Sequence, residues 1–240
     1  MQAFLLDIEG TTTPVEFVFQ VLFPYAREHV RQFLESHCGG SGVLKDIDHL
    51  RNEYSASARQ DQNLSLWVDE PPQRRMESAV AYVHWLMDRD DKSTALKSLQ
   101  GKIREEGYRS GELRSQVYPD VPPAFARWRK QNKAIWIFSS GSVLAQKLLF
   151  ANTMEGDLTP FIQGYFDTST GPKKDAASYQ RIAASMTLPA PDILFVSDVV
   201  AELDAAHLAG METRLCVRPG RPQPDSSSHP IIHTFEEILP

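Results

Sequence analysis

The chain has few cysteines, no long apolar run and no excess of basic residues. Only Cys38 and Cys216 occur among its 240 residues, which excludes a disulfide framework and a cysteine-rich zinc site. No apolar stretch is long enough to cross a membrane, and an acid soon follows the first apolar run, so we expect no membrane span and no secretory signal. The net charge of −6 argues against non-specific binding to nucleic acid or anionic membranes.

The composition is that of an ordinary globular protein, with 42% hydrophobic and 23% charged residues. A chain of 240 residues can hold one large domain, or a domain with a smaller one beside it. We find no internal repeat and no separate linker. We therefore expect a soluble cytoplasmic protein that binds neither nucleic acid nor membrane.

Short apolar runs, most of them followed directly by polar residues, predict the strands of a parallel sheet. Continuous runs of this length are typical of strands that are buried on both faces. Helical segments alternate with them after residue 115, including one over residues 120–131 that carries Phe125 and Trp128 on one side. The predicted strands are Ala3–Leu6, Ala134–Phe138, Gly164–Asp167, Ile193–Val196 and a last one at Leu215–Val217.

The segment between about residues 15 and 115 has no strand signal. Apolar residues recur there at helical spacing, as in Met76, Val80, Val83 and Met87. We therefore predict an α/β fold with a Rossmann-like parallel sheet core, helices on both faces and an inserted all-helical cap. The core would comprise residues 1–14 and 116–240, and the cap residues 15–115. An insertion after the first strand is suited to act as a lid over the carboxyl end of the sheet.

Two acids, Asp7 and Glu9, follow the first predicted strand directly. Because ligands of open α/β sheets bind beyond the carboxyl ends of the strands, both carboxylates should face that crevice. One could attack phosphorus while the other moves a proton. Gly10 permits a sharp turn, and the hydroxyl and N–H groups of residues 11–13 suit an oxyanion. Taken alone, the pattern is more often a strand end with solvated acids.

Polar residues follow two later segments in a similar way. Ser139 and Ser140 lie between the second strand and a helix, whose first N–H groups can bind an anion. Simple capping of that helix by Ser140 or Ser142 is an equally good interpretation. Lys173 stands close to another helix start and can reach a phosphate or a carboxylate, although a single lysine is usually solvated.

Asp198 ends the strand at Ile193–Val196, and Glu202 follows four residues later on a predicted helix. Residues four apart lie on one helix face, so one acid can coordinate a cation while the other orients its waters. Glu202 could instead complement the helix dipole.

Asp7, Ser139, Lys173 and Asp198, taken in this order, resemble the four sites of the haloacid dehalogenase superfamily of phosphatases. The resemblance covers essentially the whole chain. It implies that Asp7 is the nucleophile, that Ser139 binds phosphate, that Lys173 is the lysine of the family and that Asp198 binds the metal.

A closer resemblance is to the enolase-phosphatases of methionine salvage. Glu9 stands where most phosphatases of the superfamily have aspartate, and Ser197 stands where the resemblance leads us to expect threonine. The resemblance implies enolisation of 2,3-diketo-5-methylthiopentyl-1-phosphate and then its dephosphorylation, with Mg²⁺ and as a monomer. It is carried by the stretches Asp7–Thr12, Ser139–Val143 with Ala145–Phe150, and Glu106–Tyr108 with Gly111–Leu113.

The mechanism that follows from this resemblance assigns a role to each site residue. Mg²⁺ would be held by Asp7, the main-chain carbonyl of Glu9 and Asp198, with Glu202 in the same metal set. Asp7 would form an aspartyl-phosphate while Glu9 protonates the leaving oxygen and then activates water.

The remaining roles concern the phosphate and the cap. Ser139, the N–H of Ser140 and Lys173 would neutralise the phosphate oxygens. The enolisation base stays open between Glu9 and a cap residue. Arg109 is a candidate polar contact from the cap, although a solvated arginine is the commoner case.

Three alternative functions remain. A generic sugar-phosphate phosphatase of the same superfamily would give no enediol absorbance. A haloacid dehalogenase would be insensitive to EDTA. A non-catalytic phosphate-binding module would never turn over, and the presence of Asp7, Lys173 and Asp198 speaks against it.

Overall fold

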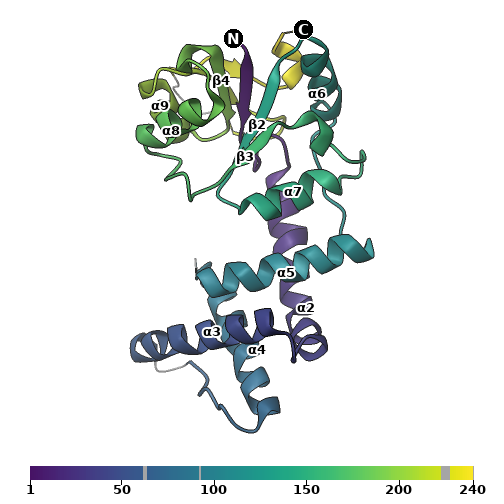
Figure 1. Ribbon diagram of the computed structural model, residues 1–240, viewed down its shortest axis with the longest axis vertical. Coiled ribbons are helices and arrows are strands. Elements are labelled where there is room, and N and C mark those ends of the chain that lie inside the picture. The colour runs from purple at the N-terminus through teal and green to yellow at the C-terminus, as the bar shows by residue number, and fades with distance from the viewer. Residues whose placement is uncertain (62–63, 92, 223–227, 240) are drawn as a thin grey trace. The chain divides into compact units, whose positions relative to one another are not determined.

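The computed structural model describes residues 1–61, 64–91, 93–222 and 228–239, and it divides into two compact units (Figure 1). The first, here called the core unit, comprises Met1–Val18 and Arg114–Pro240. The second, here called the helical unit, comprises Phe19–Leu113. In the residues described, no helix is both long and apolar enough to cross a membrane.

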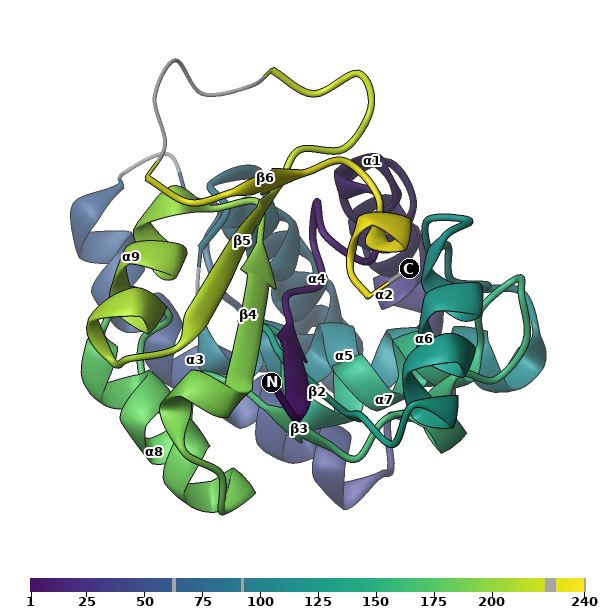
Figure 2. The same ribbon diagram turned by 90° about the horizontal axis from the view of Figure 1, so that it is seen from above.

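The core unit is built on a parallel sheet. In the part of the chain that the structure describes, the strand order is β3-β2-β1-β4-β5-β6, and Figure 2 shows β4, β5 and β6 following one another beside β1. The order reverses about β1, so the carboxyl ends of β2, β1 and β4 form the crevice typical of such sheets. The strands are β1 (Ala3–Leu6), β2 (Ala134–Phe138), β3 (Gly164–Phe166), β4 (Ile193–Ser197), β5 (Glu212–Cys216) and β6 (Ile231–Ile232).

Alternate residues of β1 face two separate apolar cores. Phe4 and Leu6 pack in one core with Trp128, whose ring centroid lies 4.0 Å from that of Phe4. Ala3 and Leu5 lie in the other core, as expected from the two-residue repeat of a strand. Helices thus cover both faces, which confirms the predicted fold class. The first core includes residues of α6 (Val121–Lys130) and α7 (Val143–Ala151), and the second includes residues of α8 (Ala176–Met186) and α9 (Val200–Leu208).

The helical unit contains no strand in its described residues, as the sequence predicts. A short α1 (Val15–Phe17) and a π-helix (Val18–Leu22) precede its first long helix. Pro24 lies in the first turn of that helix, where its missing N–H needs no partner. Val80 and Val83 are buried in the core of the unit, with Met76 and Met87 packed against it. The long helices are α2 (Phe23–Ser36), α3 (Ser41–Gln60), α4 (Pro72–Asp88) and α5 (Thr94–Ser110).

Two expectations for the C-terminal part of the chain are wrong. The strand predicted at Leu215–Val217 runs instead over Glu212–Cys216, and it is not the last, because Ile231 and Ile232 pair with it as β6. A two-residue strand is too short to leave a sequence pattern. The predicted exposed loop at 221–230 falls partly outside the described residues, at 223–227; its described residues are exposed except for His229, which is buried.

His229 is buried because both of its ring nitrogens have partners. Nδ1 lies 2.8 Å from Oγ1 of Thr213, and Nε2 lies 3.0 Å from Oδ1 of Asp204. The expected anchoring of the C-terminus is confirmed, since Phe235 and Ile238 are buried against the sheet.

Candidate active site

Three strand ends bring the predicted site residues of the core unit together. Asp7 follows β1, Ser139 follows β2 and Asp198 follows β4. The register of β1 with its two neighbours places these strand ends side by side, because Leu6 lies opposite Ile137 in β2 and opposite Val196 in β4.

The centre of the site is an ion pair between Lys173 and Asp7. The Nζ atom of Lys173 lies 2.5 Å from Oδ1 of Asp7 and 2.7 Å from Oε2 of Glu202. Burial alone would lower the pKa of the lysine, but these two carboxylates outweigh burial and raise it. Lys173 is therefore a buried ammonium group held against Asp7, and the alternative of a solvated lysine does not hold.

Main-chain and side-chain contacts fix the position of this lysine. The hydroxyl of Tyr179, which is fully buried, donates to the carbonyl of Lys173 at 2.7 Å. The hydroxyl of Ser197 donates to Oε2 of Glu202 at 3.0 Å and lies 3.4 Å from Oδ2 of Asp7. This role of Tyr179 could not be predicted from the sequence, because an aromatic residue on a helix usually belongs to the core.

The carboxylates of the site outnumber its ammonium group. Burial, and then the charge of Asp7, raise the pKa of Asp198 to about 6. The same two causes raise the pKa of Glu202, although Lys173 and Ser197 oppose them. Three acids therefore share one lysine at the strand ends, and a divalent cation would offset the excess negative charge.

The shape of the loop after β1 also suits a cation between Asp7 and Asp198. Gly10 has a φ of +74°, and a Cβ at this position would lie 2.1 Å from Oδ2 of Asp198. Only glycine leaves room for that carboxylate. The donors are all oxygens, the kind that hard cations prefer. No group of three His, Cys, Asp or Glu side chains poised for a metal occurs in the described residues, so a main-chain carbonyl and water would have to complete the shell.

The loop from Asp7 to Thr13 is held by its own main chain, and one expectation for it is wrong. The N–H groups of Thr11, Thr12 and Thr13 all donate to the carbonyl of Ile8, at 3.2, 2.9 and 2.9 Å. They close a tight turn and do not face an oxyanion. Glu9 is exposed and forms an isolated bridge with Thr13 at the base of this turn.

The turn after β2, residues 139–142, caps the start of α7. The Ser142 hydroxyl accepts from the N–H of Ala145 at 3.3 Å, so Ser142 caps α7. Oδ2 of Asp167 accepts from the N–H of Val143 at 3.1 Å and already occupies part of that helix start. Ser139 is buried with its hydroxyl 3.2 Å from the N–H of Gly141, and Ser140 is exposed. The helix start that the sequence suggested for an anion is therefore largely occupied by these internal contacts.

Arg109 lies in the helical unit, on α5. Its side chain is 77% exposed and pairs with Oε1 of Glu105 at 2.5 Å, one helical turn away. This is the solvated, locally paired state that the sequence also allowed.

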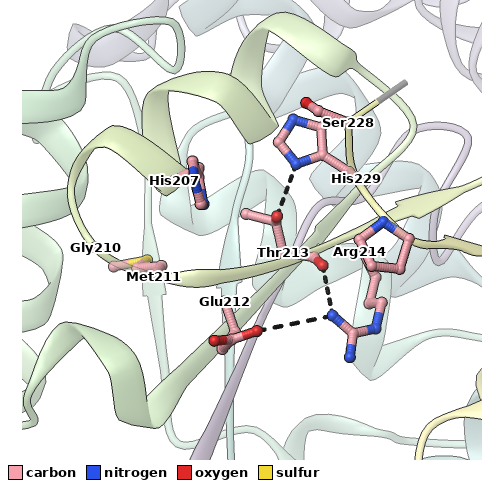
Figure 3. Close-up of a pocket in the computed structure, with 9 residues that line it drawn as sticks. His207, Gly210, Met211, Glu212, Thr213, Arg214, Ser228 and His229 are labelled. Carbon is pink, nitrogen blue, oxygen red and sulfur yellow. Dashed lines mark hydrogen bonds and ion pairs between the residues drawn. The ribbon is translucent and has the colours of Figure 1, made fainter. Parts of the chain in front are cut away.

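A pocket of about 230 Å³ lies elsewhere in the core unit, at the start of β5 (Figure 3). His207, Thr213 and His229 line it, together with Glu212 and Arg214. Figure 3 shows the His229 ring directed at Thr213. None of the predicted site residues lines this pocket, and it is distinct from the carboxylate cluster at the strand ends.

Comparisons with known proteins place the sequence in a family. A sequence model of the haloacid dehalogenase-like hydrolases matches residues 1–210. "Enolase-phosphatase E1" of Synechococcus elongatus is 53% identical over 234 residues, covering 98% of this chain and 96% of its own. The protein of the same name from Sorangium cellulosum is 45% identical, covering 100% and 97%.

Solved structures agree as well. The UTR4 protein of Saccharomyces cerevisiae superposes with a TM-score of 0.80 at 34% identity, covering 99% of both chains. The L-2-haloacid dehalogenase RSc1362 superposes with a TM-score of 0.55 at 17% identity, covering 100% and 97%, and this supports the fold alone.

Proposed function

The chain belongs to the haloacid dehalogenase-like hydrolases, and we propose that it is an enolase-phosphatase of methionine salvage. It would convert 2,3-diketo-5-methylthiopentyl-1-phosphate to 1,2-dihydroxy-3-keto-5-methylthiopentene and phosphate. The observation that carries the proposal is the buried contact of Lys173 with Asp7, in a chain that matches enolase-phosphatases over its whole length. The enzyme would act as a cytoplasmic monomer, as the resemblance implies.

The proposed cofactor is Mg²⁺. Asp7, the main-chain carbonyl of Glu9 and Asp198 would hold it, and phosphate and water would complete an all-oxygen shell. When bound, the ion would offset the repulsion between carboxylate and phosphate and would polarise a substrate carbonyl oxygen during enolisation. The excess negative charge around Asp198 supports this assignment.

In the hydrolytic half-reaction, the carboxylate of Asp7 attacks phosphorus and forms an aspartyl-phosphate. Glu9 gives a proton to the leaving oxygen and then takes one from the water that cleaves the acyl-phosphate. Lys173, the Ser139 hydroxyl and the N–H of Ser140 neutralise the oxygens of the transferred group. Fixed groups of this kind carry most of the catalysis in phosphoryl transfer, because they require no rearrangement during the reaction.

Glu202 has a different proposed role from the other acids. Its carboxylate binds Lys173 and accepts from Ser197, so we assign it to holding the lysine in place. Any effect on the cation would pass through Lys173 and water, which revises the metal-ligand role that the sequence suggested.

Enolisation needs a base beside the diketone carbon, and Glu9 or a residue of the helical insertion would supply it. The insertion, residues 15–115, would serve as the cap that excludes water from a reactive enediol. Arg109 remains the proposed polar contact from this cap to the substrate.

Substrate preference and metal dependence test the proposed function. The value of kcat/KM for the diketone phosphate should exceed that for p-nitrophenyl phosphate, and EDTA should abolish both reactions. Equal use of many phosphomonoesters would favour the generic phosphatase, and turnover of 2-haloacids in EDTA would favour a dehalogenase.

A further inference from the structure

Arg218 is a fully buried arginine behind the loop that carries Asp7 and Glu9. Its side chain is 1% exposed, which is unusual for a residue that always carries a charge. Nε and Nη2 both donate to the carbonyl of Thr11, at 2.9 and 2.6 Å. Two donors of one guanidinium group therefore converge on a single main-chain oxygen of this loop.

The guanidinium group is itself held from three sides. Nη1 donates to Oδ2 of Asp120 at 2.6 Å, so the buried charge has a partner. The rings of Tyr118 and Phe235 lie 4.2 and 4.7 Å from its central carbon, at distances typical of cation–π contact. A side chain fixed in this way presents its donors at a constant position and loses little entropy when it binds the loop.

The position of the Thr11 carbonyl affects how the loop packs against Asp198. Thr11 follows Gly10, against whose backbone the Asp198 carboxylate packs, and its own N–H closes the turn onto Ile8. A shift of this peptide would therefore move the turn relative to Asp198. The same turn carries Glu9 and the carbonyl that precedes Gly10.

We propose that Arg218 is a positioning residue of the active site, which holds the Thr11 carbonyl and thereby fixes Asp7, Glu9 and Gly10 against Asp198. It touches no reacting group and acts only through the loop. This inference rests on the proposed function in assigning chemistry to these residues, but the placement of the loop can be measured without turnover.

The chain offers a matched control in Arg127. This half-buried arginine also donates to main-chain carbonyls, those of Phe235, Ile238 and Leu239, but none of them lies in the loop after β1. Arg218→Lys keeps the charge beside Asp120 and removes the two-donor contact. Arg127→Lys makes the same chemical change at a site that holds only the C-terminal segment.

In Arg218→Lys we expect kcat to fall about 10²-fold with KM little changed, since a displacement of about 1 Å can cost that much. The fall should be seen with both the diketone phosphate and p-nitrophenyl phosphate. Arg127→Lys should keep the wild-type kcat even where its thermal midpoint falls. Asp120→Asn, which weakens the hold on Nη1 but leaves an oxygen for it, should lower kcat in the same direction and less.

Amide hydrogen exchange at Thr11, Thr12 and Thr13 reports on the loop directly. These amides should lose protection in Arg218→Lys and in Asp120→Asn, and should keep it in Arg127→Lys. Unchanged exchange with a wild-type kcat in Arg218→Lys would overturn the proposal, as would an equal loss of kcat in Arg127→Lys. If the wild-type chain leaves the diketone phosphate unchanged, the proposed function fails, while the exchange result still decides the role of Arg218.

Discussion

The Nζ atom of Lys173 lies 2.5 Å from Oδ1 of Asp7, and neither side chain is more than 9% exposed. A buried pair of this kind holds the proposed nucleophile and the proposed phosphate-binding ammonium group at one point of the fold. Such an arrangement is costly to leave unpaired, so removal of either partner should affect more than catalysis.

Asp7→Asn should abolish phosphate release while the fold survives. An amide nearly preserves the shape of the carboxylate but cannot act as the nucleophile, so we expect a loss on the order of 10⁴-fold or more. Phosphate release and the thermal midpoint should be measured together. A folded variant with near-wild-type turnover would remove Asp7 from the mechanism.

Glu202→Gln separates the two roles that an acid at this position can have. If the carboxylate holds Lys173, kcat should fall and the Mg²⁺ concentration for half-maximal activity should stay the same. The reason is that an amide pairs more weakly with an ammonium group than a carboxylate does. A shift in the Mg²⁺ half-saturation with kcat preserved would return Glu202 to the metal set.

Gly10→Ala should impair the cation site more than it impairs the fold. The added Cβ would meet Oδ2 of Asp198 and push that carboxylate away. Gly111→Ala is the matched control, because Gly111 has a φ of +80° and nothing within 4 Å of an added Cβ. Both variants should lose roughly 1 kcal/mol of stability to backbone strain. Only Gly10→Ala should weaken Mg²⁺ binding in calorimetric titration, and equal binding in the two variants would contradict the proposed packing.

Asp198 should make the cation-free protein less stable as the pH rises. Its pKa is raised to about 6 in the folded chain, above the unfolded value. Protonated Asp198 therefore adds to the free energy of unfolding; this stabilisation is fully present below about pH 4 and is lost as the pH rises past 6. Asp198→Asn removes this penalty. In EDTA, the free energy of unfolding of the variant, relative to that of the wild type, should rise by up to about 2 kcal/mol between pH 5 and pH 7.5.

Urea denaturation of both proteins at these two pH values measures that gain. Added Mg²⁺ should reverse it, because the ion stabilises only the wild-type carboxylate pair. If the two proteins differ in free energy of unfolding by the same amount at both pH values, the pKa of Asp198 is not raised in the folded chain.

The main features of the fold follow from the sequence, because buried parallel strands leave continuous apolar runs. Asp7, Ser139 and Asp198 end three such runs, and strand register alone brings them level. The β6 strand leaves no such signal, since Ile231 and Ile232 form it only by pairing with β5.

Several contacts of the site could not be predicted from the sequence either, because they join residues from separate segments of the chain. The pairing of Glu202 with Lys173 joins a residue of α9 to a residue of the turn before α8, whereas the spacing of Asp198 and Glu202 along the sequence favours a different role. Arg218 follows a strand as many exposed arginines do. Its contact with Thr11 depends on how the chain folds back beside the first strand.

Glu9→Asp tests how the two half-reactions share one acid. Aspartate is one methylene shorter, so we expect its carboxylate to lie further from the leaving oxygen. If Glu9 serves only that oxygen, the enol-phosphate should accumulate while its formation stays fast. If Glu9 is also the base, both steps should slow together, by roughly 10²-fold for a displacement of about 1 Å. Stopped-flow absorbance beside a phosphate assay distinguishes the two, and wild-type rates for both steps would deny the extra methylene any role.

The most direct test of the proposed function follows enediol absorbance and phosphate in one reaction of the wild-type protein, with the diketone phosphate and Mg²⁺. An enolase-phosphatase should form the enediol product in an amount equal to the phosphate released, and EDTA should stop both signals. Phosphate released without enediol absorbance would contradict the proposed function, and so would the absence of both signals from the folded, Mg²⁺-loaded protein.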